Sequence, residues 1–172
     1  MHHPRKGGPP GTHDAGANAQ LYRVRLDGSG LEALTSSRGC KAAPHDVGGG
    51  VVMMVHLSCF GPRSIELFRV ADKSVVDAAL VGQEPHWPDL ASDGRHMLVT
   101  RDTFESTQVL EVDWKTKRST VLWSLPMGSE NAHAAWGDGR SSVLFQRGGA
   151  VWRRRLGAKP VEEKLFEMGE PS

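Results

Sequence analysis

The stretch that decides the fold is Leu90-Ala-Ser-Asp-Gly-Arg-His-Met-Leu-Val-Thr100. The same pattern recurs in Trp136-Gly-Asp-Gly-Arg-Ser-Ser-Val-Leu-Phe145. In both stretches an Asp-Gly-Arg turn is followed by a short apolar segment, and Gly94 and Gly139 lie 45 residues apart. Gly49 lies another 45 residues upstream and also precedes an apolar segment. A period in the low forties predicts stacked copies of one supersecondary unit.

Each of these apolar segments is followed by a second pair of short strands. Alternating apolar and polar residues predict a strand, a turn rich in small or charged residues follows it, and another apolar segment comes after the turn. The strands expected in this way are 21–26 and 31–35, 65–70 and 75–81, 109–113 and 120–125, and 151–156 and 161–166. We therefore predict an all-β fold of β-propeller blades, each a four-stranded antiparallel sheet, because a sandwich would not repeat Asp-Gly-Arg at a fixed interval.

The segment Leu21-Tyr-Arg-Val-Arg-Leu-Asp-Gly-Ser-Gly-Leu-Glu-Ala-Leu-Thr35 resembles the closing half of a TolB-like (WD40-like) propeller repeat. The two Asp-Gly-Arg stretches resemble its opening half, although neither keeps the full Trp-Ser-Pro-Asp-Gly turn of the family. The resemblance covers residues 19–168 and implies blades at 19–35, 43–82, 85–125 and 132–168. Composition predicts a disordered leader at 1–18, and residues 169–172 form a short tail.

About three and a half blades do not close a ring of the usual four to eight. Either the first and last segments join into one blade of an undersized ring, or the chain is a fragment of a longer propeller, which we favour. In the second case the chain would associate with further blades or with itself. A truncated reading frame without a function of its own is a third alternative.

Composition and charge exclude several classes of protein. Lys and Arg number 21 and Asp and Glu 20, a net charge of +1, which argues against a nucleic-acid partner. No apolar run approaches the length of a membrane span. The sequence shows no signal peptide, which predicts a cytoplasmic location as written, whereas the TolB-like resemblance implies a periplasmic one if the N-terminus is truncated. Cys40 and Cys59 fit no zinc motif, and whether they form one bridge stays open.

Three histidines form the one candidate ligand site in the sequence. His45, His86 and His133 precede Gly49, Gly94 and Gly139 by four, eight and six residues, in what should be the innermost strand of each blade or its entry loop. Innermost strands line the central channel of a propeller, so these side chains are candidates for ligand binding. They are equally explained as packing and hydrogen-bonding residues. The predicted turn residues, which have a structural role only, are Gly49, Asp93, Gly94, Asp138 and Gly139.

Catalytic motifs are missing from the sequence: it holds no Gly-x-Ser-x-Gly elbow, no phosphate-binding loop and no dinucleotide fingerprint. Trp87, Trp136 and Trp152 are expected to pack between blades rather than to form a binding platform. We therefore predict a non-catalytic binding or scaffold module for a protein or small ligand on the loop face, with no catalytic residue and no cofactor.

The alternative is a fragment of a propeller enzyme. One form of it is the propeller domain of a serine peptidase, whose catalytic half would then lie outside this chain. The other form resembles oligogalacturonate lyase, in which the three histidines would hold a divalent metal such as Mn or Zn.

Overall fold

The computed structural model describes residues 19–36, 40–57, 62–126 and 133–168. Within these residues all regular structure is β, and no helix is present that could cross a membrane. A short two-stranded sheet comes first, β1 (Tyr22–Arg23) with β2 (Glu32–Ala33). Three four-stranded antiparallel sheets follow. They consist of β3 (Cys40–Gly48), β4 (Val51–Leu57), β5 (Ser64–Arg69) and β6 (Ser74–Ala79); β7 (Pro85–Leu90), β8 (His96–Asp102), β9 (Ser106–Asp113) and β10 (Arg118–Pro126); and β11 (Ala134–Gly137), β12 (Ser142–Arg147), β13 (Ala150–Arg155) and β14 (Val161–Glu167).

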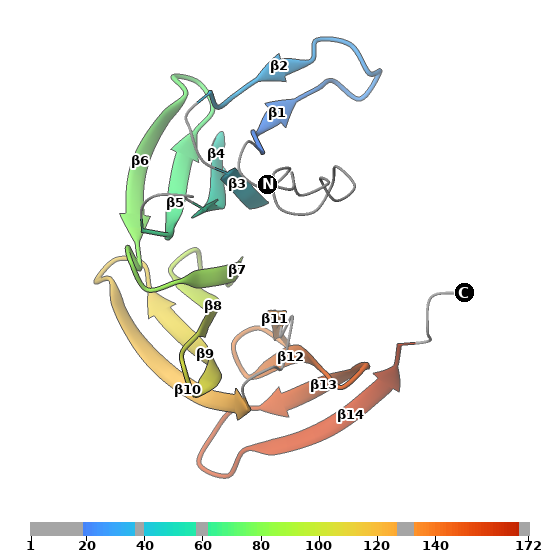
Figure 1. The fold of residues 1–172 in the computed structure, drawn as a ribbon. Helices are drawn as coiled ribbons and strands as arrows, with labels where there is room; N and C mark the ends of the chain where they lie inside the picture. The colour runs from blue at the N-terminus through green and yellow to red at the C-terminus, as the bar shows by residue number, and fades with distance from the viewer. Residues whose placement is uncertain (1–18, 37–39, 58–61, 127–132, 169–172) are drawn as a thin grey trace, which may run out of the picture.

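The sheets fan out along an open arc, as Figure 1 shows. Within each four-stranded sheet every strand pairs with the next in the chain, so these sheets are simple meanders. The first strands, β3, β7 and β11, lie at the inner edge of the arc, and the fourth strands, β6, β10 and β14, lie at its outer edge (Figure 1). The predicted all-β class and the four-stranded blades of a partial propeller are confirmed.

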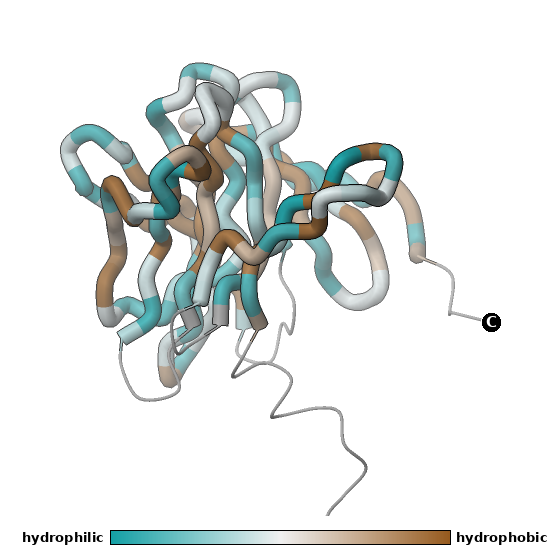
Figure 2. Tube along the Cα trace, turned by 90° about the horizontal axis from the view of Figure 1, so that it is seen from above, coloured by the Kyte–Doolittle hydropathy of each residue, from teal (hydrophilic) through white to brown (hydrophobic). Residues whose placement is uncertain are grey.

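Apolar side chains fill the space between neighbouring sheets. Successive residues of a strand point to opposite faces, and Figure 2 shows the corresponding mixture of apolar and polar residues along the strands. In β8, Met97 and Val99 pack with the β3–β6 sheet, whereas Leu98 between them packs with the β11–β14 sheet. All three are fully buried. The middle sheet is therefore apolar on both faces.

The cluster between the first two four-stranded sheets consists mainly of Met53, Val55, Ile65, Met97, Val99, Leu110 and Val112. The cluster between the second and third consists of Leu98, Val109, Trp123, Leu125, Ala134, Val143 and Phe145. A smaller cluster, Leu34, Met54 and Phe68, joins the two-stranded sheet to the rest.

The turns between first and second strands contain the repeated glycines. Gly49, Gly94 and Gly139 all have positive φ, a conformation that glycine adopts without strain. Asp93 accepts hydrogen bonds from the backbone N–H of Arg95 and of His96 at 2.8 and 2.9 Å, which closes its turn. These bonds, with that from the His96 ring, hold the pKa of Asp93 well below its usual range.

The Asp138–Gly139 turn is built differently from the Asp93–Gly94 turn. Asp138 itself has φ 45°, and its carbonyl, rather than its carboxylate, accepts from the hydroxyl of Ser141 at 2.8 Å. Leu90 lies three residues before Asp93, whereas Trp136 lies two residues before Asp138. The Asp-Gly-Arg sequence therefore closes loops of different length in the two sheets.

Two boundaries differ from those expected. The first four-stranded sheet begins at Cys40 rather than at residue 43, because Pro44 lies in a bulge inside β3 instead of ending the strand. The strands expected at 21–26 and 31–35 are shorter in the structure, where β1 and β2 contain two residues each. Among the described strands they pair only with each other, so no neighbouring strand extends them. The leader (1–18), the tail (169–172) and Cys59 lie outside the described residues, so the predictions made for them are not tested.

A buried ionic cluster lies on the β3–β6 sheet. Lys41, whose side chain is 5% exposed, places its Nζ 2.6 Å from Oε2 of Glu66 and 2.9 Å from Nδ1 of His56. His56 Nδ1 lies 2.8 Å from the other carboxylate oxygen of Glu66. Although burial opposes it, hydrogen bonding from Lys41 and His56 lowers the pKa of Glu66.

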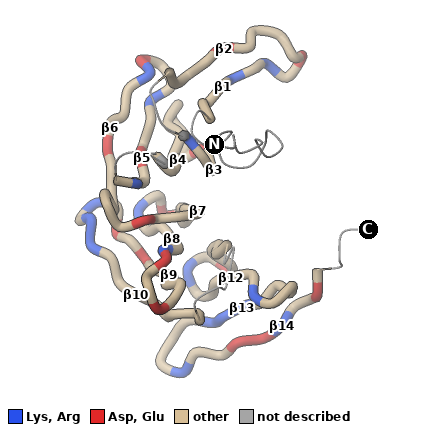
Figure 3. The backbone as a smooth tube through the Cα atoms, in the orientation of Figure 1, with Lys and Arg blue, Asp and Glu red and all other residues tan. Residues whose placement is uncertain are grey.

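Polar contacts also join neighbouring sheets. The carboxylate of Asp89 in β7 accepts a hydrogen bond from the backbone N–H of Trp136 in β11 at 2.7 Å. Lys73, in the hairpin between β5 and β6, reaches Glu32 of β2 at 2.8 Å, and Lys117, in the hairpin between β9 and β10, reaches Asp77 of β6. Figure 3 shows basic residues on β13 and residues of both signs along β14.

We predict that Glu66→Gln destabilises the protein by about 3 kcal/mol at pH 7, because it removes the anion from a buried pair. The unfolded pKa is near 4.5 and the folded pKa is lower. The stabilisation by Glu66 is therefore complete above pH 4.5 and is lost as the pH falls toward the folded pKa. Urea unfolding at pH 7, 5 and 3.5 should show the difference between wild type and variant shrinking on acidification.

The matched control for Glu66→Gln is Glu105→Gln, since Glu105 is exposed. It should change the free energy of unfolding by less than about 0.5 kcal/mol at every pH. An equal effect of both substitutions, or a difference independent of pH, would contradict a stabilising role for the Glu66 anion.

We also predict that Asp89→Ala costs about 1.5 to 3 kcal/mol, because it removes a charged acceptor from a buried contact between two sheets. Asp46→Ala is the control, since Asp46 accepts only the nearby N–H of Gly48 at 2.8 Å. Thermal melts followed by circular dichroism should show a clearly larger loss for the Asp89 variant. Equal losses would show that the contact between sheets adds nothing.

Candidate functional site

The inner strands β3 and β7 share a bulge that sets the geometry of the inner edge. In β7, His86 lies opposite Thr100 and Asp89 opposite Leu98, so two residues, Trp87 and Pro88, face the single residue between those partners. Proline cannot donate to the ladder, and a bulge accommodates it. Trp87 takes φ 47°, a value that non-glycine residues seldom adopt.

The same bulge occurs one blade earlier, where Ala42 lies opposite Val55 and His45 opposite Met53. Ala43 and Pro44 occupy the bulge, and Ala43 has φ 49°. Ala43 is thus the counterpart of Trp87. The strained conformation belongs to the position, and β7 places the bulkiest side chain there.

The three predicted histidines do not occupy one repeated position. Counted along the ladders, the counterpart of His45 in β7 is Asp89, and the counterpart of His86 in β3 is Ala42. The carbonyl of His133 accepts from the N–H of Gln146 at 3.3 Å, so His133 matches His86 rather than His45.

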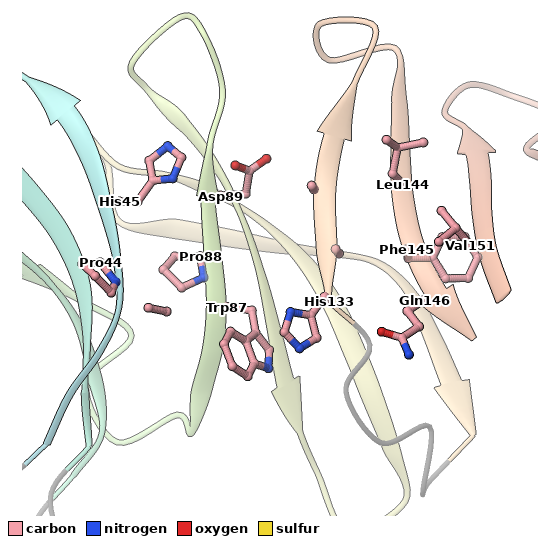
Figure 4. A pocket seen from close by; sticks show the side chains of 13 residues that line it. Pro44, His45, Trp87, Pro88, Asp89, His133, Leu144, Phe145, Gln146 and Val151 are labelled. Atoms are coloured by element: carbon pink, nitrogen blue, oxygen red, sulfur yellow. The ribbon is translucent and has the colours of Figure 1, made fainter. Parts of the chain in front are cut away.

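Two of the three histidines nevertheless line one pocket. Figure 4 shows His45 and His133 on either side of Trp87 and Pro88, in an open pocket of about 410 Å³ at the inner edge. Trp87 stacks on the ring of His133 with centroids 3.9 Å apart and an interplanar angle of 26°. The pocket is lined by Ala43, Pro44, His45, Trp87, Pro88, Asp89, His133, Ala134, Ala135, Leu144, Phe145, Gln146 and Val151.

His86 lines a different, much smaller cavity of about 60 Å³, together with Ala42, Ala43, Val55 and Trp87. Its Nε2 accepts a hydrogen bond from Arg63 at 3.1 Å and lies 3.6 Å from the carboxylate of Asp102. Burial, and then the charge of Arg63, lower the pKa of His86, which favours the neutral ring. His86 is therefore held in a polar network of its own.

The described residues do not bring together three His, Cys, Asp or Glu side chains in an arrangement that could hold a metal ion. His45, His133 and Asp89 line the same pocket, and one carboxylate oxygen of Asp89 accepts the N–H of Trp136. The chemistry that the pocket offers is stacking on Trp87, apolar contact with its prolines and alanines, and hydrogen bonding to histidine rings and to Gln146.

Trp87 is the pocket residue whose exposure the sequence argument did not anticipate. Trp136 and Trp152 pack against the second apolar cluster, as expected of residues between blades. The side chain of Trp87 instead remains 38% exposed. A signal was present in the sequence: Pro44 and Pro88 lie 44 residues apart, each followed by a polar residue.

No family model matches the sequence, and no curated protein does. The structure is similar to TolB from Acinetobacter baumannii, with a TM-score of 0.70 and 18% identity over 87% of this chain and 38% of that one. It is similar to an oligogalacturonate lyase in complex with manganese, with a TM-score of 0.59 and 18% identity over 88% of this chain and 47% of the other.

It is also similar to a prolyl endopeptidase, with a TM-score of 0.52 and 16% identity over 91% of this chain and 27% of that one. The chain thus spans less than half the length of each of these proteins. The order of its strands, the sheets fanned along an arc and these similarities agree: the chain has the fold of part of a β-propeller.

Proposed function

We propose that this chain is a non-catalytic binding module of a larger propeller, and that the Trp87 pocket takes up an extended peptide segment of a partner protein. The observation that carries the proposal is Trp87 itself. Its backbone is held at positive φ, and its ring stacks on His133 while remaining 38% exposed in an open pocket. Strained residues persist where the surrounding structure fixes them, and they gather at binding sites.

The composition of the pocket supports a peptide as its ligand. An indole offers a broad, rigid contact area at low entropic cost, and the prolines of the two bulges give the wall a fixed apolar surface. The histidine rings and the amide of Gln146 supply donors and acceptors for a peptide backbone. An anionic ligand has less support, because the lining contains no Lys or Arg.

A non-catalytic role is supported by the same list of side chains. The lining contains no Ser, Thr, Cys, Lys or Tyr that could act as a nucleophile beside the histidines. General acid–base catalysis by His45 or His133 would need a reacting group within hydrogen-bond distance of the ring.

The second candidate is a segment of a propeller enzyme with a metal centre. It is favoured by one observation, that His45 and His133 line the same pocket as Asp89. Manganese is named for one of the similar structures, and there it belongs to that protein. The described residues do not bring three such side chains together around one point, so the site would need a further ligand from elsewhere. Stoichiometric Mn or Zn in the purified protein, lost in His45→Ala and in His133→Ala, would favour this candidate.

We predict that peptides selected against the full chain depend on Trp87. A phage-displayed library of random dodecapeptides is enriched on the immobilised protein, and the selected peptides are titrated by calorimetry against wild type and Trp87→Ala. Removal of an aromatic anchor from the centre of an interface costs at least about 2 kcal/mol. We therefore expect affinity to fall about 30-fold or more.

Phe104→Ala is the matched control for the peptide experiment, since Phe104 is an aromatic residue that is 96% exposed and lies outside the pocket. It should leave the dissociation constants unchanged. Peptides that bind wild type and Trp87→Ala equally, or a library that yields no binder, would overturn the assignment of the pocket.

A further inference from the structure

The Trp87 indole borders two cavities. One is the open pocket of about 410 Å³, where the indole stacks on the ring of His133. The other is the cavity of about 60 Å³ that we call the slot, and it is lined by Ala42, Ala43, Val55, His86 and Trp87. In Figure 4, His133 lies on one side of Trp87 and Pro44 of β3 on the other. His133 does not line the slot, so the slot lies against a part of the indole that the stacked ring leaves uncovered.

The slot exists because two alanines occupy β3 where β7 has large side chains. Ala42 is the counterpart of His86 along the inner strands. Ala43 is the counterpart of Trp87, at the same bulge. Val55, which lies opposite Ala42 in the ladder, closes the slot on the side of the apolar core. With methyl groups in β3 and an indole in β7, the two inner strands leave a space between the first and second four-stranded sheets.

The volume and the lining of the slot favour a small aliphatic group. A water molecule occupies about 30 Å³ in the liquid. A cavity of about 60 Å³ therefore suits a side chain the size of valine or proline, and leucine and the aromatic side chains are too large. Among the described residues the lining has no Lys, Arg, Asp or Glu. It offers methyl groups on one wall and an aromatic surface on the other, both of which are suited to apolar contact.

His86 supplies a hydrogen-bond donor at the slot. An arginine side chain can only donate, so Nε2 of His86 accepts from Arg63 at 3.1 Å and the proton of the neutral ring is on Nδ1. Burial, and then the charge of Arg63, lower the pKa of His86 and so favour the neutral ring. None of the described residues accepts a hydrogen bond from Nδ1 of His86. This N–H is thus available to a backbone carbonyl of a bound segment.

We propose that the slot is a specificity subsite of the peptide site, and that it receives a small aliphatic side chain, such as valine or proline, from the bound segment. The two cavities share Ala43 and Trp87, so a segment that lies along the inner edge can place one residue in the slot while its neighbours lie in the larger pocket. The inference rests on the proposed peptide-binding role and adds to it a requirement for one small residue.

N-acetylated amino acid amides test the slot without any selected peptide. Valine methyl groups are labelled with ¹³C in the full chain, and the Val55 signal, assigned through Val55→Ile, is followed during each titration. We expect saturable shifts with the valine and proline amides. The leucine and phenylalanine amides should bind about 10-fold or more weakly, since one methylene too many in an apolar pocket has about that effect. No saturable shift with the small amides, or equal affinity for the phenylalanine amide, would overturn the proposal.

Ala42→Leu should abolish the shifts of Val55, because the longer side chain fills the slot from β3. The matched control is Ala78→Leu, since Ala78 is also half-buried in a strand but lines neither cavity. It should leave the affinity for the valine amide unchanged. Shifts that survive Ala42→Leu would overturn the proposal. The size series in the wild-type chain decides the question if Ala42→Leu does not fold.

Peptides selected from the library separate this inference from the proposed function. Those that depend on Trp87 should share a small aliphatic residue at one position, and Ala42→Leu should weaken their binding about 10-fold or more. Peptides that need Trp87 but bind Ala42→Leu as tightly as wild type would overturn the subsite and leave the peptide site standing. A saturable response to the small amides with no peptide from the library would uphold the slot and overturn the peptide site.

Discussion

Burial of apolar side chains between neighbouring sheets is the constraint on which the structure depends. In β8, Met97 and Val99 face one neighbour and Leu98 faces the other, and none of the three is exposed to solvent. Exposing either face of such a sheet would lose about 1.5 to 3 kcal/mol for each large apolar side chain that is now buried. The sheets must therefore stack side by side, and their meander order then places every first strand at the inner edge.

The pocket results from the prolines of the inner strands. Proline cannot donate a hydrogen bond to the ladder, and the bulges at Pro44 and Pro88 accommodate it by placing two residues opposite one. The residue before each proline then takes positive φ. In β3 that residue is Ala43, whose methyl group adds little apolar surface to the pocket. In β7 it is Trp87, whose ring lies against His133 of the following blade, so the adjustment that accommodates the proline also creates the exposed aromatic surface.

The sequence predicts the fold far better than the site, for a physical reason. A 45-residue interval between Asp-Gly-Arg turns, with alternating segments between them, depends only on local turn chemistry and on the pleat of a strand, both visible in the residues. Equivalence of His45, His86 and His133 depends instead on the register of each inner strand. A bulge shifts register by one residue, and a shift of one moves a side chain to the other face. The bulge lies at the same place in β3 and β7, but His45 follows it and His86 precedes it, so the two have different counterparts although both precede a repeat glycine.

The pocket lies where blades meet, so its shape depends on how they pack. Its lining comes from all three four-stranded sheets, with Pro44 from β3, Trp87 from β7 and Leu144 from β12. The stacking of Trp87 on His133 and the hydrogen bond from the N–H of Trp136 to Asp89 join the second and third of these sheets beside the pocket. Under the proposed function, a ligand that contacts more than one sheet would stabilise their packing by the free energy that it gains from that packing, because coupling between two binding events is reciprocal.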